Sequence, residues 1–373
     1  MENKKEIAYC KKCILPDRYP EISLDEQGIC NFCLAHSNRA VLGGEALAAL
    51  VNSLKRSSSQ YDCVVPVSGG KDSAFILHYA VKKMNLKAVA VNYDSGMQSD
   101  LAIENMKNAC RILSVPLVFK RADTKLQIKR VKTMLKLSER LSSFVLGCGG
   151  CVPVLQAVTI GFANDNNIPI VLDGGSSLEH APVLKNKIKK SKFASIVKKL
   201  KNRIDPILKY RLYDLDFVKY AYLFKYRRYN KQLNDQMSVS KAIKPPLGYT
   251  DPFVSKNTTV IRFSNYMMLP EEEIVRVIKE ELDWKSPAGT DKRFDCLLHC
   301  LSDFDHLMKY GITSNGMVYS NIIRQGLMSR EEAFCKESYA KDNISKECAA
   351  LFNKFELDNY NKRVFKKAED LLS

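Results

Sequence analysis

Several features are missing from this sequence of 373 residues. It has no uninterrupted apolar run close to the roughly 18 residues that a membrane-spanning helix requires. Its first residues, Met1-Glu2-Asn3-Lys4-Lys5-Glu6, lack the apolar segment of a secretory signal peptide. It contains no internal repeat and no long low-complexity segment. We therefore expect a cytoplasmic protein of two or three globular domains, at the usual ~100–200 residues each.

A glutaminase signature is also absent. The nucleophile of a class I glutaminase lies in a Gly-x-Cys-x-Gly motif, but Leu146 stands two residues before Cys148 here. A class II enzyme needs an N-terminal cysteine, and the residue at position 2 is Glu2. We therefore expect that this chain does not release its own ammonia from glutamine.

Acidic residues are scarce in one segment. The formal net charge is +17, and residues 181–231 contain 16 Lys and Arg but only three acids. The first part of this segment has apolar residues at helical spacing between lysines, and its later part is rich in tyrosine. The pattern is typical of a solvated helix packed on its own domain, of a peripheral membrane or acidic-partner surface, or of a nucleic-acid surface. We favour the first two interpretations over nucleic acid.

Short β-branched runs alternate with helical patterns along the middle of the chain. Strands are predicted at 62–67, 87–93, 115–119 and 168–172, with helices at 73–84, 99–113, 123–140 and 152–166. This alternation predicts an α/β fold in which a parallel sheet has helices on both faces. Later elements are predicted as a strand at 258–263, a helix at 271–282, a helix capped by Ser329 and Glu332, and a final helix at 350–372.

Composition divides the chain into four predicted parts. We expect a cysteine-rich head with a linker helix at 1–58, an α/β core at 59–180, a basic aromatic-rich helical insert at 181–245, and a completing strand with a helical C-terminal region at 246–373.

The stretch from Val64 to Ser73 indicates a phosphate-binding loop. A β-branched run leads into Ser68-Gly69-Gly70-Lys71-Asp72-Ser73, and a helical pattern follows. Glycines let the backbone approach an anion, and a helix N-terminus turns unpaired N–H groups toward it. The spacing differs from that of a Walker A loop. The segment resembles the pyrophosphate loop (PP-loop) of the ATP pyrophosphatase superfamily, whose members cleave ATP to AMP and pyrophosphate and leave an adenylated substrate.

Two further strand exits carry an acid beside small residues. Asp94 precedes Ser95 and Gly96, and Asp173 precedes Gly174. Ligands of parallel sheets bind beyond the carboxyl ends of the strands, so these residues and the glycine-rich loop should share one edge. We expect them to hold a nucleotide and its Mg²⁺, although each acid could instead be a helix cap or turn residue.

Six of the twelve cysteines form Cys-x-x-Cys pairs. Two of these pairs have the spacing of a four-cysteine zinc ribbon or knuckle, and they consist of Cys10, Cys13, Cys30 and Cys33. We expect a closed structural zinc site there, with rubredoxin-like iron and free thiols as alternatives.

The third pair, Cys148 and Cys151, cannot complete a metal site alone. We expect Cys296 to be a third thiolate, with Cys300 as its rival. Three thiolates would suit an iron–sulfur cluster with one open iron, or a zinc with a free position. A redox pair and unliganded buried thiols are the alternatives.

Several motifs together resemble the N-acetyl sugar amidotransferase family. They are the head from Tyr9 to Asp17, the two cysteine pairs, the PP-loop, the strand exit Asn92–Gly96 and Asp295-Cys296-x-x-His299. Members of this family serve bacterial O-antigen and flagellar nonulosonic-acid pathways, where they convert an acetamido group into an acetamidino group. The resemblance extends nearly end to end. It implies that ATP adenylates the amide oxygen of a nucleotide-linked N-acetyl sugar and that ammonia then displaces AMP.

The resemblance also implies roles and partners. Ser68, Gly69, Gly70, Asp72 and Ser73 would cradle the pyrophosphate, Lys71 would add a supporting charge, and Asp94 or Asp173 would serve the nucleotide or metal. Ammonia would come from a separate HisH-like glutaminase, assisted by a HisF-like subunit. The main rival is a tRNA-thiolating PP-loop enzyme, because it would explain both the basic segment and a three-cysteine iron–sulfur cluster.

Overall fold

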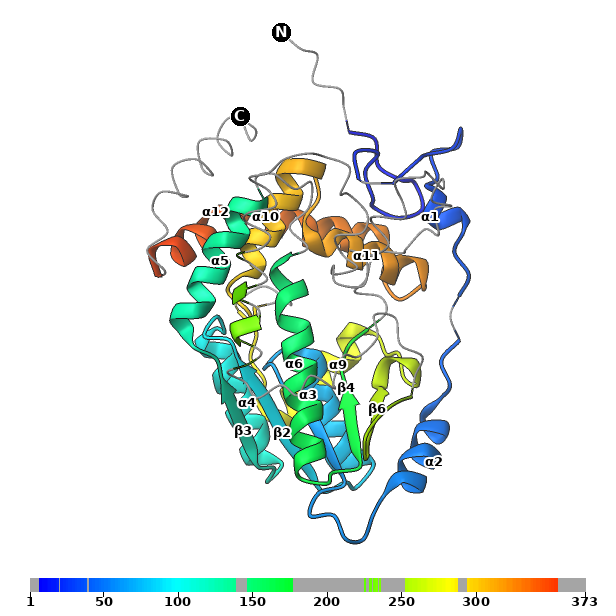
Figure 1. The fold of residues 1–373 in the computed structure, drawn as a ribbon. Coiled ribbons are helices and arrows are strands. Elements are labelled where there is room, and N and C mark those ends of the chain that lie inside the picture. Colours follow the sequence, from blue (N-terminus) through cyan, green and yellow to red (C-terminus); the bar gives the residue numbers. More distant parts are fainter. Residues whose placement is uncertain are drawn as a thin grey trace, which may run out of the picture.

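The computed structural model of the protein describes residues 7–19, 21–38, 40–138, 146–176, 252–287 and 294–354, together with positions 225, 228, 229, 231–233 and 235 (Figure 1). Most of the basic insert and nearly all of the predicted final helix lie outside these residues. None of the described helices is both long and apolar enough to cross a lipid bilayer.

A six-stranded sheet in the order β3-β2-β1-β4-β6-β5 forms the centre of the structure. Its strands are β1 (Cys63–Pro66), β2 (Ala88–Asp94), β3 (Leu117–Arg121), β4 (Ile170–Asp173), β5 (Phe253–Ser255) and β6 (Thr258–Arg262). All neighbouring pairs are parallel except β5 and β6, which are antiparallel. The predicted parallel sheet is confirmed, whereas the three-residue edge strand β5 was not predicted.

Alternate strand residues face two different hydrophobic cores. In β1, Cys63 and Val65 belong to one core, while Val64 belongs to the other. The first core includes side chains of α2 (Gly44–Leu54), α3 (Lys71–His78), α4 (Asp100–Ile112) and α9 (Glu271–Leu282). The second includes side chains of α5 (Thr124–Ser138) and α6 (Leu146–Asp165), which lies in front of the sheet in Figure 1. Helices therefore cover both faces, as the alternating pattern predicts.

Helix boundaries agree with the sequence to different degrees. The predicted helix at 271–282 coincides with α9. The helix predicted at 73–84 begins at Lys71 as α3 and continues as a π-helical turn, Tyr79–Lys83. The predicted cap is confirmed at α12 (Arg330–Lys354), because the backbone N–H of Glu332 donates to Ser329 Oγ at 3.0 Å. Helix α6 starts at Leu146 rather than at 152, so the third cysteine pair lies inside it.

The cysteine-rich head packs on two helices from much later in the chain, α11 (Ser314–Arg324) and α12. After α1 (Asn31–Leu34) the chain passes to α2, but the head itself contacts α11 and α12 (Figure 1). Arg330 donates from Nε to the Cys13 carbonyl and from Nη2 to the Cys10 carbonyl, both at 2.9 Å. The head, residues 7–19 and 21–33, therefore packs together with the helices α10 (His299–Tyr310), α11 and α12, and we call these elements the helical unit.

Candidate functional site

The glycine-rich loop connects β1 to α3 at the carboxyl edge of the sheet. Gly69 has φ +82°, and a Cβ built there would lie only 2.1 Å from the backbone oxygen of Ala102 in α4. Both the left-handed conformation and the close approach require glycine. Gly70 is the N-cap residue of α3, and no side chain caps it.

Two serine hydroxyls close the loop on itself. The backbone N–H of Ser68 donates to Ser73 Oγ at 3.2 Å, and Ser73 Oγ donates to the Gly70 carbonyl at 3.1 Å. The backbone N–H of Gly70 reaches Ser68 Oγ at 3.3 Å. These contacts fix the loop directly before the first turn of α3, where amide N–H groups have no intrahelical acceptor. Such an arrangement can bind an anion such as a phosphate, as the sequence predicts.

Residues distant in the sequence hold the loop from behind. Trp284 Nε1 donates to the Gly69 carbonyl at 3.0 Å, and Asn105 Nδ2 lies 3.4 Å from the same oxygen. Asn105 also exchanges two hydrogen bonds with the backbone of Lys285, at 2.8 and 3.0 Å. Sequence reasoning missed both side chains. The available signal was the only tryptophan of the chain, placed two residues after a strongly amphipathic helix.

The loop lysine takes part in a short chain of charges. Lys71 Nζ lies 3.0 Å from Asp72 Oδ2 and 3.8 Å from Glu271 Oε2 at the start of α9. Glu271 Oε1 in turn lies 3.3 Å from Lys336 Nζ on α12. Asp72 is about half exposed, with a side-chain exposure of 49%, so its carboxylate is open to solvent and ligands. These contacts connect the loop to the helical unit.

The structure places Asp94 at the end of β2, next to the strand that precedes the loop. Its carboxylate is buried and accepts hydrogen bonds from the backbone N–H of Gly96 at 2.8 Å and from Arg121 Nε at 2.7 Å. This is the turn role that we considered as the alternative for this residue. A direct role in binding nucleotide or metal would require a ligand to share the carboxylate with Arg121.

Asp173 lies at the end of β4, on the other side of β1. Its Oδ1 accepts from the backbone N–H of Gly175 at 3.4 Å, and the Gly175 carbonyl accepts from Ser264 Oγ at 3.0 Å. A Cβ at Gly174 would come within 3.2 Å of Ile76 in α3, so this turn lies against the helix that follows the loop. The two predicted acids thus flank the loop on opposite sides, and their roles stay predictions.

A segment from much later in the chain also reaches the loop. The backbone N–H of Leu297 donates to the Met97 carbonyl at 2.8 Å, beside a β-bridge between Cys296 and Gln98. Asp295 Oδ2 would lie 3.5 Å from a Cβ built on Gly70. His299 Nε2 lies 3.4 Å from Asp295 Oδ1, and the imidazole is largely buried. The Asp295-Cys296-x-x-His299 motif is therefore part of this site.

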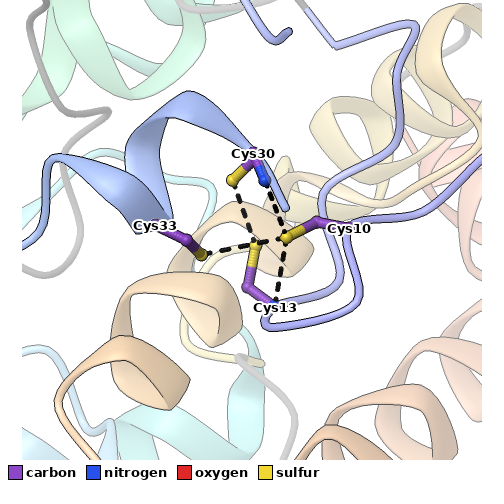
Figure 2. Close-up of side chains that lie close together, drawn as sticks. All are labelled: Cys10, Cys13, Cys30 and Cys33. Atoms are coloured by element: carbon purple, nitrogen blue, oxygen red, sulfur yellow. Dashed lines mark hydrogen bonds between the residues drawn. The ribbon is translucent and has the colours of Figure 1, made fainter. Parts of the chain in front are cut away.

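The four head cysteines converge, as predicted (Figure 2). Their sulfur atoms all lie within 4.8 Å of one another, and all four residues are buried. Cys10 Sγ is 3.9 Å from Cys33 Sγ, and Cys13 Sγ is 3.8 Å from Cys30 Sγ. A tetrahedral ion with metal–sulfur bonds of ~2.3 Å requires sulfur–sulfur distances of about 3.8 Å, so the cluster fits a single metal ion.

Hydrogen-bond donors surround the Cys10 sulfur, and a cation lies beside Cys33. Backbone N–H groups of Lys12, Cys13 and Cys30 donate to Cys10 Sγ at 3.2–3.4 Å. Hydrogen bonds from the other thiols, that of Cys13 foremost, lower the pKa of the Cys10 thiol. The buried guanidinium of Arg324 lies 3.8 Å from Cys33 Sγ and offsets negative charge there. The donor set could hold zinc or iron, and a closed four-thiolate site is structural rather than catalytic.

The predicted second centre has a less complete description. Arg130 Nη2 donates to Cys151 Sγ at 2.8 Å, while Cys296 lies in the segment beside Met97 and Gln98. Cys300 donates to the Leu297 carbonyl at 3.1 Å, and both hydrogen bonding with Cys348 and burial raise the pKa of its thiol. Among the side chains that the structure describes, only the head cysteines form a group of three or more metal-ligating atoms. The Cys148 side chain is outside that description, so this centre stays a prediction.

Comparisons with known proteins give distant structural likenesses. No family model and no curated protein matches the chain. An NMN synthetase from Francisella tularensis has 13% identity and a TM-score of 0.26, over 54% of this chain and 98% of that one. The U34-tRNA thiolase NcsA from Methanococcus maripaludis, with its 4Fe-4S cluster, has 15% identity and a TM-score of 0.33, over 87% of this chain and 88% of that one.

A third likeness is to the NH3-dependent NAD synthetase from Campylobacter jejuni subsp. jejuni NCTC 11168 in complex with the nitrate ion. It has 12% identity and a TM-score of 0.27, over 54% of this chain and 97% of that one. With TM-scores of 0.33 or less, none of these three likenesses assigns a family or an activity to this chain.

Proposed function

We propose that this protein is a PP-loop enzyme that uses ATP to adenylate the amide oxygen of an N-acetyl amino sugar. Ammonia then displaces AMP, and the products are an acetamidino sugar, AMP and pyrophosphate. The observation that carries this proposal is the loop itself. It has the PP-loop sequence at a strand-to-helix corner, its Gly69 carbonyl is held by Trp284, and the Asp295 segment lies against Gly70.

The proposed reaction follows from the chemistry of an amide. An amide oxygen is a poor leaving group, and transfer of AMP to it creates a good one. The pyrophosphate that leaves carries negative charge, which the N-terminus of α3 and the Lys71 ammonium would stabilise. Bound Mg²⁺ would neutralise further charge on the phosphates. The exposed Asp72 carboxylate, and the Asp295 carboxylate that would lie 3.5 Å from a Cβ on Gly70, are acids at the loop that could hold such an ion.

The attacking nitrogen would come from outside this chain. Because the sequence lacks both glutaminase signatures, we propose a separate HisH-like glutaminase, with a HisF-like subunit, as the ammonia source. We propose zinc as the ion of the four head cysteines, because one tetrahedral ion fits their sulfur–sulfur distances. Its role would be to hold the head against α11 and α12.

A direct assay tests this proposal. The purified chain is incubated with ATP, Mg²⁺, ammonium and a panel of UDP-linked N-acetyl sugars. We expect AMP and pyrophosphate in equal amounts, and mass spectrometry should show a sugar whose amide oxygen is replaced by NH. The Ser73→Ala variant, which loses the contacts that the Ser73 hydroxyl makes within the loop, serves as the inactive control. Sulfur transfer to tRNA without any sugar product would instead support the thiolase alternative.

A further inference from the structure

A basic pocket lies between α5 and the described part of the basic segment. Its volume is about 310 Å³, within the range of small-molecule sites. The α5 side contributes Leu126 and Lys129. The other wall consists of Lys225, Arg228, Tyr229 and Gln232. Figure 1 shows the short described pieces of this segment close to α5.

The chemistry of the lining points to a phosphorylated ligand. Three of the six lining side chains are cationic, and none of the six carries a carboxylate. Lys129 and Arg228 are exposed, so their charged groups are accessible to a ligand at the pocket. Guanidinium and ammonium groups form charge-assisted hydrogen bonds with phosphate oxygens, and Arg can do so through two N–H groups at once. A diphosphate group has the charge and the oxygen atoms to engage all three cations.

The other lining residues suit the nucleobase, sugar or apolar group that carries the diphosphate. Tyr229 offers an aromatic face, which can stack on a nucleobase or on the apolar face of a sugar ring. Leu126 adds an apolar wall, and Gln232 can both donate and accept hydrogen bonds. The pocket therefore combines charge recognition with an aromatic and an apolar surface.

The pocket also lies near the carboxyl edge of the sheet, where the candidate site is. Helix α5 starts at Thr124, which would contact a Cβ on Gly96 at the end of β2. Lys129 is five residues further along, which corresponds to about 7.5 Å of helix rise. Between them, Gln127 Nε2 donates to the Tyr93 hydroxyl of β2 at 3.4 Å, which anchors this part of α5 to the sheet. A ligand in the pocket would thus lie near the exit of β2, one of the two strand exits that flank the PP-loop.

We propose that this pocket binds the diphosphate of an activated sugar, and so positions the N-acetyl substrate for adenylation at the PP-loop. The inference rests on the proposed function for the identity of the sugar. It assigns to part of the basic, tyrosine-rich segment the role of a substrate-binding wall. A sugar diphosphate can be linked to a nucleoside or to an isoprenoid lipid, and both share the group that the three cations recognise.

Binding measurements on the full-length protein test the pocket without turnover. Isothermal titration uses UDP as the probe for a nucleotide-linked sugar and farnesyl diphosphate as the probe for a lipid-linked one. The variants are Lys129→Glu and Arg228→Glu. Lys107→Glu, at an exposed position of α4 outside the pocket, is the control with the same change in net charge. A non-hydrolysable ATP analogue reports separately on the PP-loop.

We expect at least one probe to bind the parent protein, and each pocket variant to weaken it by about tenfold or more, because one charge-assisted hydrogen bond is worth at least that factor. The ATP analogue should bind these variants as it binds the parent. Conversely, Ser73→Ala should weaken the analogue and leave the probe unaffected. The probe that binds more tightly identifies the nucleoside or the lipid source.

Two binding results would overturn the inference: binding of neither probe, or equal loss of probe affinity in Lys107→Glu and the pocket variants. If probes bind as expected but no sugar is amidated, the proposed function fails and the diphosphate site stands. If sugar is amidated but the pocket variants keep the parent KM for it, the inference fails alone.

Discussion

Replacing Gly69 by alanine should destabilise the α/β core and disable the loop. The left-handed backbone conformation costs an L-residue about 1–2 kcal/mol. The new Cβ would start 2.1 Å from the Ala102 oxygen and must move by more than an ångström to reach an ordinary contact distance. Forced rearrangement of a packed region typically costs about 1–3 kcal/mol more. We therefore expect the free energy of unfolding to fall by about 2–5 kcal/mol, which a domain of ordinary stability survives.

Urea unfolding followed by fluorescence can measure this change, because the only tryptophan, Trp284, donates to the Gly69 carbonyl and reports on this part of the fold. Gly326→Ala is the matched control: Gly326 also has a positive φ, +74°, but a Cβ there has no neighbour within 4 Å. This control variant should lose only the unfolding free energy that a positive φ costs an alanine residue. Equal losses of unfolding free energy in the two variants would refute the close-approach argument. The folded Gly69→Ala protein should also bind the ATP analogue poorly, since its loop has moved.

Three other predictions follow from the contacts above. Cys10→Ser should lose about one metal ion per chain by elemental analysis and should lower the melting temperature of the helical unit, because a closed site couples metal binding to folding. An unchanged metal content would contradict a metal site at the four head cysteines. Trp284→Phe keeps an aromatic ring but removes the 3.0 Å hydrogen bond to the Gly69 carbonyl, so the free energy of unfolding, followed by circular dichroism, should fall by about 1 kcal/mol and the KM for ATP should rise. A KM equal to that of the parent would show that the loop does not need this hydrogen bond. Burial lowers the pKa of the His306 imidazole in the folded protein, so below the ordinary histidine pKa of about 6.5 the unfolded state binds the imidazole proton more readily. The free energy of unfolding should therefore fall as the pH drops through this range. His306→Gln should flatten this part of the curve of unfolding free energy against pH, and an unchanged slope would assign the pH dependence to other groups.

The α/β core was readable from the sequence because its signals are local. Each buried parallel strand is a short β-branched run, and α9 combines acids in its first turn with a strong apolar period, so its limits were predicted to the residue. Strand β5 has only three residues and no pattern to detect. The start of α6 was misplaced because Gly147, Gly149 and Gly150 have low helix propensity, which the surrounding structure overrides.

The candidate site was predictable only where it is contiguous. Residues of the glycine-rich loop are adjacent in sequence, and their spacing predicts the corner that the structure contains. Trp284 and Asp295 reach the loop through tertiary packing, from more than two hundred residues away, and no periodicity marks them. Likewise, ligand spacing predicts the four-cysteine cluster, whereas the contact of Arg324 with Cys33 depends on how the head docks.

The docking of the head on α11 and α12 has a consequence for synthesis of the protein. Cys33 and Arg324 are separated by 291 positions. At a ribosomal rate of ~5–20 residues per second, about 15–60 s pass between the emergence of the cysteines and that of the helices that cover them. During this interval the head has no helical surface to pack on, so metal capture is the interaction that can already hold its four thiols together. We therefore expect metal capture to precede docking, and without the metal the four thiols would still be apart when α11 and α12 leave the ribosome.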